Sequence, residues 1–477
     1  MVEATMLHFT DREQQYPLKR PAELRAEDYL EISRPYIIAK AEEQASRCSQ
    51  CGVPFCQVHC PLHNNIPDWL RLTAEGRLEE AYELSNATSS MPEICGRICP
   101  QDRLCEGNCV IEKDFGSVTI GSVEKFITDT AWEEGWVKPL VPVADRGGQS
   151  VGIIGAGPAG LTAAEMLRVK GYEVHVYDRY DRAGGLLTYG IPGFKLEKYV
   201  VTRRIERLEA GGIIFHLGFE VGRDASLDEL RDRHDSILIA TGVYKPRDIN
   251  VPGIDATGVV GALDYLTRSN RRGFGDTVTD AADYDAAGKH VVVIGGGDTA
   301  MDCVRTAVRQ GAASVKCLYR RDRANMPGSQ REVAHAEEEG VEFVWLSAPH
   351  SVLGSPAAVV LADKMRLGAP GPDGRRAPEL DDGGRFRLDA DLVIKALGFD
   401  PEDLPVAFGN AALGVNRWGT LRVDHKTMAT SLDGVFAAGD IVRGASLVVW
   451  AIRDGRDVAA AMHKYMAAKV EALRVAA

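Results

Sequence analysis

Eight of the ten cysteines in this 477-residue chain lie close together, between residues 48 and 109. They form two groups, spaced C-x2-C-x4-C-x3-C (Cys48, Cys51, Cys56, Cys60) and C-x3-C-x5-C-x3-C (Cys95, Cys99, Cys105, Cys109). Thiolates in fours suit iron–sulfur clusters or structural zinc, and the lack of an apolar export signal at the N-terminus disfavours disulfides. We therefore expect residues 1–145, which are rich in helix formers, to be a helical domain around metal centres in a cytoplasmic protein.

A first glycine-rich turn follows the cysteine region. VGIIGAGPAG (residues 151–160) is an apolar strand that leads into a helix, and the next strand ends at Asp178. The glycines permit a tight turn, a close approach of pyrophosphate and close helix packing, and the acid can accept hydrogen bonds from a ribose. We assign this unit to FAD. Its predicted contacts are Gly155, Gly157, Pro158, Ala159, Gly160 and Asp178.

A second turn, VVVIGGGDTA (residues 291–300), repeats the pattern with alanine as the third small residue. Its second strand ends in Arg320 and Arg321, where an acid would otherwise stand. Arginine cannot accept a bond from a 2′-hydroxyl but can pair with a 2′-phosphate, which favours NADPH over NADH; a solvated strand end is the alternative. The predicted contacts are Gly295, Gly297, Asp298, Thr299, Ala300, Arg320 and Arg321.

Two further segments are candidates for flavin contacts. GLLTYGIPGFKL begins with Gly185 and Leu186, where backbone can pass close to the flavin ring; a surface loop is the alternative. VFAAGD ends in Gly439 and Asp440, which can bond FAD or cap the next helix. The order of these segments predicts an α/β fold with two Rossmann-like domains after the helical one: a discontinuous FAD domain (146–250 and 398–477) and an inserted NADPH domain (251–397).

The composition excludes several classes of function. A net charge of −12 argues against nucleic acid or an anionic membrane as the main partner, and no apolar stretch approaches the ~20 residues that span a bilayer. Neither glycine-rich unit has a neighbouring C-x-x-C, which excludes a dithiol mechanism of the thioredoxin-reductase type. Flavin and NADPH signatures in one chain favour iron–sulfur clusters over zinc, because clusters turn a two-electron donor into single-electron output. The polar, glycine-rich segment 368–384 is expected to be a solvated hairpin tip.

The motifs CSQCGVPFCQVHCP, ICGRICPQDRLCEGNC, GIIGAGPAGL, YGIPGFKL, VIGGGDTAMDC and GVFAAGDIVRGASLVVWAI extend over most of the chain. Together they resemble the small (beta) subunit of bacterial NADPH-dependent glutamate synthase. The same architecture is known from the N-terminal half of dihydropyrimidine dehydrogenase and from related NADPH–ferredoxin oxidoreductase subunits. These relatives provide the alternative function, an electron-transfer subunit that feeds ferredoxin or a pyrimidine-reducing partner. A metal-stabilised redox-sensing scaffold without enzymatic activity is the non-enzyme alternative.

The resemblance implies that NADPH reduces FAD and that two [4Fe–4S] clusters carry the electrons to a large, FMN-containing subunit with glutaminase activity, in a hetero-oligomer. That partner makes L-glutamate from glutamine and 2-oxoglutarate. No protein acid or base is needed for the hydride step, so no catalytic residue is assigned. The implied ligands of cluster one are Cys48, Cys51, Cys56 and Cys109. The implied ligands of cluster two are Cys60, Cys99, Cys105, and Cys95 or Glu124.

Overall fold

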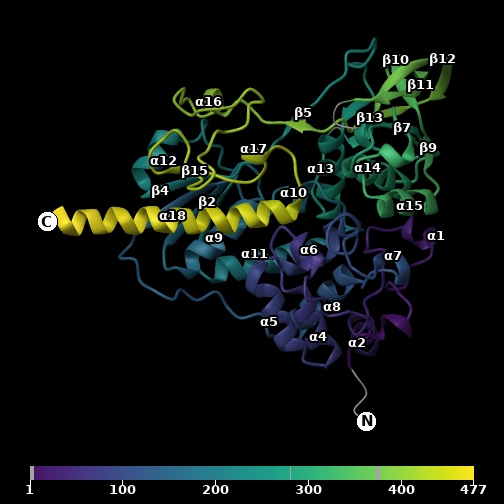
Figure 1. Ribbon diagram of the computed structural model, residues 1–477. Helices are drawn as coiled ribbons and strands as arrows, with labels where there is room; N and C mark the ends of the chain where they lie inside the picture. Colours follow the sequence, from purple (N-terminus) through teal and green to yellow (C-terminus); the bar gives the residue numbers. More distant parts are fainter. Residues whose placement is uncertain (1–4, 280, 372–375, 477) are drawn as a thin grey trace.

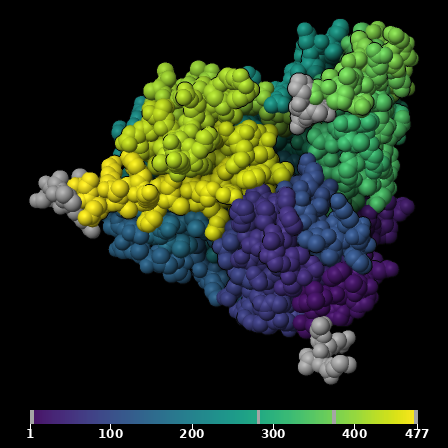
Figure 2. All heavy atoms as spheres, viewed as in Figure 1, coloured from purple at the N-terminus to yellow at the C-terminus, as the bar shows by residue number. Residues whose placement is uncertain are grey.

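The computed structural model describes residues 5–279, 281–371 and 376–476, and three parts of the chain meet at its centre (Figures 1 and 2). The first, the helical part, carries both cysteine groups. Its longer helices pack on a core that includes the fully buried Trp69, whose Nε1 donates to Asn64 Oδ1 at 3.0 Å. Its elements are η1 (His8–Thr10), α1 (Ala22–Arg25), α2 (Ile38–Ala45), α3 (Phe55–Val58), α4 (Ile66–Ala74), α5 (Leu78–Thr88), α6 (Pro92–Ile98), η2 (Gln101–Arg103), α7 (Glu112–Phe115) and α8 (Ile120–Glu133).

The second part, the first nucleotide-binding fold, is a parallel five-stranded sheet in the order β15-β4-β1-β2-β3. Its strands are β1 (Ser150–Ile154), β2 (Glu173–Asp178), β3 (Ile213–Leu217), β4 (Ser236–Ile239) and β15 (Val435–Ala437). The residues of β1 after Ser150 are all buried, as is typical of a parallel strand with both faces covered. Because β15 pairs with β4, the C-terminal segment returns to the sheet that the chain left near residue 240.

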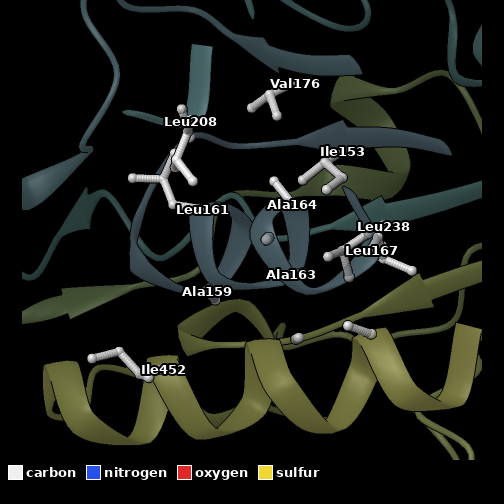
Figure 3. Close-up of a cluster of buried hydrophobic side chains, with 14 of the residues drawn as sticks. Ile153, Ala159, Leu161, Ala163, Ala164, Leu167, Val176, Leu208, Leu238 and Ile452 are labelled. Atoms are coloured by element: carbon white, nitrogen blue, oxygen red, sulfur yellow. The ribbon is translucent and has the colours of Figure 1, made fainter. Parts of the chain in front are cut away.

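Helices cover both faces of this sheet. They are α9 (Pro158–Val169), α10 (Leu186–Tyr189), α11 (Lys198–Ala210), α12 (Leu227–Arg233), α16 (Leu404–Ala407), α17 (Asp440–Arg443) and α18 (Val448–Ala476). Figure 3 shows α9 between the sheet, which contributes Ile153, and α18, which contributes Ile452. A Cβ on Gly455 of α18 would lie 2.4 Å from Ala159 O, so glycine is required where the two helices cross. The long C-terminal helix is therefore held against the helix of the first glycine turn.

The third part, the second nucleotide-binding fold, is a parallel sheet in the order β6-β13-β7-β8-β9. Its elements are β6 (Val259–Gly261), α13 (Ala262–Gly273), η3 (Ala281–Tyr284), β7 (His290–Ile294), α14 (Asp298–Arg309), β8 (Ser314–Leu318), η4 (Arg323–Asn325), α15 (Gln330–Glu338), β9 (Glu342–Val344) and β13 (Leu392–Lys395). A two-stranded antiparallel pair, β5 (Lys245–Pro246) and β14 (Phe399–Asp400), joins the two folds. The second fold is thus inserted into the first, as the sequence predicts.

An antiparallel sheet of β10 (Ser347–Leu353), β11 (Val359–Pro370) and β12 (Arg376–Asp389) extends from the second fold (Figure 1). The prediction of a solvated hairpin tip over residues 368–384 is only partly right. The strands β11 and β12 continue through most of this segment, and residues 372–375 lie outside the described residues. Most side chains of β12 are exposed. The polar composition of this segment is therefore explained by its contact with solvent, and it does not indicate that a strand is absent.

Residues 16–36, called here the N-terminal arm, run from the helical part onto the second nucleotide-binding fold. Arg25 is buried there, with Nη2 at 2.9 Å from Glu338 Oε2 and Nη1 at 3.4 Å from Glu339 Oε1. The Glu339 carboxylate also accepts hydrogen bonds from Arg305 and Arg309, and none of these three side chains is exposed. The arm is therefore a structural link between distant parts of the chain. Within the described residues, no helix is both long and apolar enough to cross a membrane.

Candidate redox site at the junction of the three parts

One cavity of about 1030 Å³ lies where the three parts meet. The first nucleotide-binding fold contributes Gly155, Asp178 and Gly439 to its lining, the second contributes Asp298, and the helical part contributes Cys99. The N-terminal arm forms a further wall. The structure thus brings both glycine turns and a cysteine of the second group to one cavity.

The first glycine turn has the geometry of a dinucleotide site. Gly155 has φ +110°, and a Cβ there would lie 2.4 Å from Ala240 O, so only glycine fits. A Cβ on Gly157 would meet no atom within 4 Å, which leaves space at the N-terminus of α9 for a phosphate. Asp178 accepts hydrogen bonds from Ala156 N at 2.7 Å and Tyr180 N at 2.8 Å, and burial raises its pKa. Its carboxylate holds the turn in place and keeps lone pairs for a ribose.

The two other predicted flavin segments converge on this turn. A Cβ on Gly185 would lie 2.9 Å from Gly157 Cα, and one on Gly439 would lie 2.9 Å from Ala159 Cβ. Leu186, Pro158, Ala159, Gly439 and Asp440 line the cavity, and Gly160 is buried behind the turn. Ser446 Oγ donates to Asp440 Oδ1 at 2.7 Å, and burial raises the pKa of this carboxyl. The buried Thr241 Oγ1, also in the lining, has no hydrogen-bond partner among the described residues and is available to a ligand.

The second glycine turn has the same local geometry. A Cβ on Gly295 would lie 2.2 Å from Ala396 O, whereas one on Gly297 would meet no atom within 4 Å. Thr299 lines the cavity beside Asp298, and Ala300 is fully buried. Arg320 is exposed, two residues after the end of β8 at Leu318. Arg321 has a buried Nε without a hydrogen-bond partner, and neither arginine has an ion pair among the described residues. Both guanidinium groups are therefore available to a phosphate.

The first three cysteines of the chain lie beside the last one of the second group. Burial raises the pKa of Cys48 to about 11, with Cys109 and Cys51 adding to the rise. Burial likewise raises the pKa of Cys56 to about 12, with Cys109 the largest charged contributor. The structure thus brings Cys48, Cys51, Cys56 and Cys109 together across 61 positions of sequence, the separation of the first and last.

The remaining cysteines form a second set closer to the cavity. Burial raises the pKa of Cys60 to about 11, and Glu124 and Cys95 contribute; the pKa of Cys105 is raised by burial, Glu106 and Cys60. Cys99 is hydrogen-bonded to Cys95, which raises its pKa. Burial raises the pKa of Glu124 to about 8, although Ser85 Oγ donates to it at 3.3 Å. Both candidates for a fourth ligand, Cys95 and Glu124, therefore lie beside this set.

The donor chemistry of both sets fits iron–sulfur clusters. All ten cysteines are free thiols, and burial holds the pKa values cited above far from neutrality, so thiolates there need the compensating charge of a bound metal centre. Among the described residues no three Cys, His, Asp or Glu side chains converge on a single-ion site.

Several residues that shape this site are not marked by any sequence motif. Phe194, in the predicted flavin segment, packs under the guanidinium groups of Arg305 and Arg309, whose Cζ atoms lie 4.5 and 3.9 Å from the ring centroid. Lys195 next to it pairs with Asp302 of α14. These contacts join residues more than 100 positions apart, and no local pattern marks them. The second half of YGIPGFKL thus anchors the first fold to the second.

Comparison with known proteins agrees with this division of the chain. Residues 25–136 match the family model described as dihydropyrimidine dehydrogenase domain II, 4Fe-4S cluster. Residues 149–455 match the model for pyridine nucleotide-disulphide oxidoreductase. The solved structure of Mycobacterium tuberculosis FprA in complex with NADPH is similar with a TM-score of 0.57 and 18% identity, covering 68% of this chain and 86% of that one. At this identity the likeness shows the fold alone.

Curated relatives extend over nearly the whole chain. The glutamate synthase [NADPH] small chain of Azospirillum brasilense is 66% identical over 476 residues, which is 99% of this chain and 98% of that protein. The protein of the same name from Escherichia coli (strain K12) is 45% identical and covers 94% of this chain and 97% of its own length. The chain therefore belongs to the family of small chains of NADPH-dependent glutamate synthase.

Proposed function

We propose that this chain is the electron-input subunit of a glutamate synthase, which oxidises NADPH through FAD and passes the electrons on through two [4Fe–4S] clusters. The observation that carries this proposal is the shared cavity. Gly155 of the first turn, Asp298 of the second and Cys99 of the helical part all line it. A hydride donor, a flavin and a one-electron acceptor can therefore occupy one site.

The hydride step depends on position. The nicotinamide and flavin rings only have to lie against each other, which requires no proton transfer by the protein. Bound FAD supplies the change from a two-electron donor to one-electron acceptors. Leu187, Ile191 and Leu447 are apolar members of the lining and exclude water from the rings. Val448, the first residue of α18, also lines the cavity, and the positive end of that helix favours negative charge there.

The proposed nucleotide contacts are those predicted from the sequence. For FAD they are Gly155, Gly157, Pro158, Ala159, Gly160, Asp178, Gly185, Leu186, Gly439 and Asp440. For NADPH they are Gly295, Gly297, Asp298, Thr299, Ala300, Arg320 and Arg321. The orphaned Thr241 Oγ1 and the open space at Gly157 and Gly297 support these assignments. The domain limits of 1–145, 146–250 with 398–477, and 251–397 stay predictions.

The proposed cluster ligands are crossed between the two cysteine groups. Cys48, Cys51, Cys56 and Cys109 hold cluster one; Cys60, Cys99 and Cys105 hold cluster two, with Cys95 or Glu124. Cys99 lines the cavity, whereas no member of the first set is among the described lining residues. This supports a route from the flavin to cluster two and then to cluster one.

The surface above cluster one supports an exit for the electrons. Val53, Phe55, Val58 and Val110 are exposed apolar residues that flank the cysteines of the first set. We propose that a large subunit carrying FMN and glutaminase activity docks here, in a cytoplasmic hetero-oligomer, and uses the electrons to make L-glutamate from glutamine and 2-oxoglutarate. The small-chain name of the relatives supports a larger partner.

Anaerobic purification of the tagged chain from its own host tests the proposal. We expect flavin absorbance that NADPH bleaches, and a stoichiometric large subunit with glutamate synthase activity. Phe55→Ser should release the large subunit while NADPH still bleaches the flavin. Trp418→Ser, at an even more exposed aromatic residue away from the cysteines, should retain the partner. Recovery of ferredoxin or a pyrimidine-reducing subunit instead would contradict the proposed product.

A further inference from the structure

Arg103 connects the cluster region to the second nucleotide-binding fold. It ends η2, between Cys99 and Cys105, and its side chain reaches α14. Its Nη1 donates to Pro327 O at 2.8 Å, and its Nη2 donates to Asp298 Oδ2 at 3.2 Å. Asp298 is the first residue of α14, directly after the second glycine turn. An arginine of the helical part therefore stands at the helix N-terminus where a dinucleotide pyrophosphate binds.

At this position there is space for a phosphate, and the negative charge of Asp298 has to be neutralised before a phosphate can bind. No atom lies within 4 Å of a Cβ built on Gly297, and the Arg103 and Asp298 side chains stay 43% and 39% exposed. The Asp298 carboxylate would repel a pyrophosphate. Its Oδ1 accepts a bond from Ser329 N at 2.9 Å, and Arg103 neutralises its other oxygen. A guanidinium has five N–H donors, and only two are used in these contacts, so donors remain for phosphate oxygens.

Neighbouring contacts hold the helical part in a fixed position against the residues at the start of α15. Ser329 Oγ donates to Asp102 Oδ2 at 3.1 Å, and Arg331 Nη2 donates to Glu106 Oε2 at 2.8 Å. Both acids lie in the helical part, on either side of Arg103 in sequence, and both donors lie just before or within α15. The helical part is thus fixed against the nucleotide loop at several points, which keeps the Arg103 guanidinium at α14.

We infer that Arg103 binds the pyrophosphate of NADPH, so that the helical part completes the nucleotide site of the second fold. The inference rests on the proposed function, because it deepens the NADPH site named there. Arg103 then has two connected roles, because it neutralises Asp298 and also donates hydrogen bonds to the phosphate oxygens. The 2′-phosphate, expected at Arg320 and Arg321, is a separate contact.

The test measures NADP⁺ binding to the anaerobic protein with FAD and clusters in place, through the change in the flavin spectrum. Arg103→Ala should weaken NADP⁺ roughly tenfold and reduce the salt dependence of binding. Adenosine 2′-monophosphate, which has no pyrophosphate, should bind the variant and the wild type equally. The KM for NADPH should rise while kcat stays unchanged, because the contact is the same before and during hydride transfer. Arg387→Ala, an exposed arginine on β12, is the matched control and should change neither value.

A double variant separates phosphate binding from neutralisation of Asp298. If Arg103 only offsets the Asp298 charge, Arg103→Ala combined with Asp298→Asn will bind NADP⁺ as tightly as the wild type, and the inference is wrong. If Arg103 contacts phosphate, the double variant stays weakened, and Arg103→Lys retains part of the affinity. Loss of iron or FAD from Arg103→Ala would also overturn the inference, in favour of a structural role. Failure of the proposed function is seen separately, as a wild-type flavin that NADPH does not bleach.

Discussion

The ammonium of Lys195 lies 2.9 Å from Asp302 Oδ1, across the boundary between the two nucleotide-binding folds. Glu332 Oε2 is 3.6 Å from the same nitrogen. The Lys195 side chain is only 14% exposed, and burial raises the pKa of Asp302 to about 6 in spite of the lysine. This pair fixes the segment expected to contact the flavin against α14, the helix expected to contact NADPH.

We expect Lys195→Met to destabilise the protein by about 3 kcal/mol, because it leaves the buried Asp302 carboxylate without a cation, whereas Glu332 keeps its ion pair with Arg305. The measurement is the midpoint of denaturation with flavin fluorescence as the probe. Lys19→Met is the control, since Lys19 pairs with Glu338 but is 39% exposed, and its loss should cost less than 1 kcal/mol. Equal losses in the two variants would contradict the importance of burial at Lys195.

His234 should make the first nucleotide-binding fold sensitive to acid. Its Nε2 is 2.9 Å from Tyr177 OH and its Nδ1 is 3.1 Å from Ser150 Oγ, and burial, with His175 and His216 adding to it, lowers its pKa to about 4. An unfolded histidine has a pKa near 6.5, so the unfolded chain binds more protons between these values. Stability from this group is therefore complete above about pH 6.5 and is lost as the pH falls toward 4.

Thermal melts between pH 4 and pH 8 measure this effect. His234→Gln should flatten the dependence between pH 4 and pH 6.5, while the wild type melts at progressively lower temperature there. His425→Gln serves as the matched control, because His425 is an exposed histidine in the same fold. A variant as acid-sensitive as the wild type would mean that another group carries the effect.

The crossed cysteine sets predict which variants share a defect. Cys109→Ser should lose the same cluster as Cys51→Ser, and Cys105→Ser the same cluster as Cys60→Ser. Iron content should fall toward half in each variant, and the reduced spectra measured by electron paramagnetic resonance should sort the four variants into these pairs. Cys303→Ser, a buried thiol of the second fold, should keep both clusters. If Cys109→Ser pairs with Cys105→Ser instead, each sequence group holds its own cluster.

Arg320 and Arg321 should determine the choice between NADPH and NADH. Each alanine variant should raise the KM for NADPH roughly tenfold, because it removes one or two charge-assisted hydrogen bonds to the 2′-phosphate. The KM for NADH should change little. Flavin bleaching at a series of concentrations of either nucleotide measures this. Arg323→Ala is the control, because Arg323 is paired with Glu337 at 2.7 Å. An equal rise in KM for both nucleotides would contradict a contact with the 2′-phosphate.

Local chemistry made much of this molecule predictable from its sequence. The glycines of both turns, the acid at Asp178 and the return of residues 435–437 to the first sheet depend on short patterns with a known geometric cause. The spacing of cysteines also predicts metal sites, because four thiols close in sequence have few other uses in a reducing compartment.

Contacts between the three parts could not be predicted in this way. Arg25 with Glu339, Lys195 with Asp302 and Arg103 with Asp298 join residues that are more than 100 positions apart. Nothing in the sequence around each of these residues distinguishes it from a charged residue on the protein surface. Only the docking of one part on another buries these charges or turns them toward the cavity. The same reason explains why the N-terminal arm shows no sign in its sequence that it lines the central cavity.

The proposed crossing of the cysteine groups would have a consequence for how the protein is made. Cys48, Cys51 and Cys56 leave the ribosome well before Cys109, and Cys60 leaves it before Cys99 and Cys105. With ligands drawn from both groups, neither cluster is complete until the helical part has been synthesised almost to its end. Iron delivery must therefore wait for a chain that has already begun to fold, and each inserted cluster then ties the beginning of that part to its end.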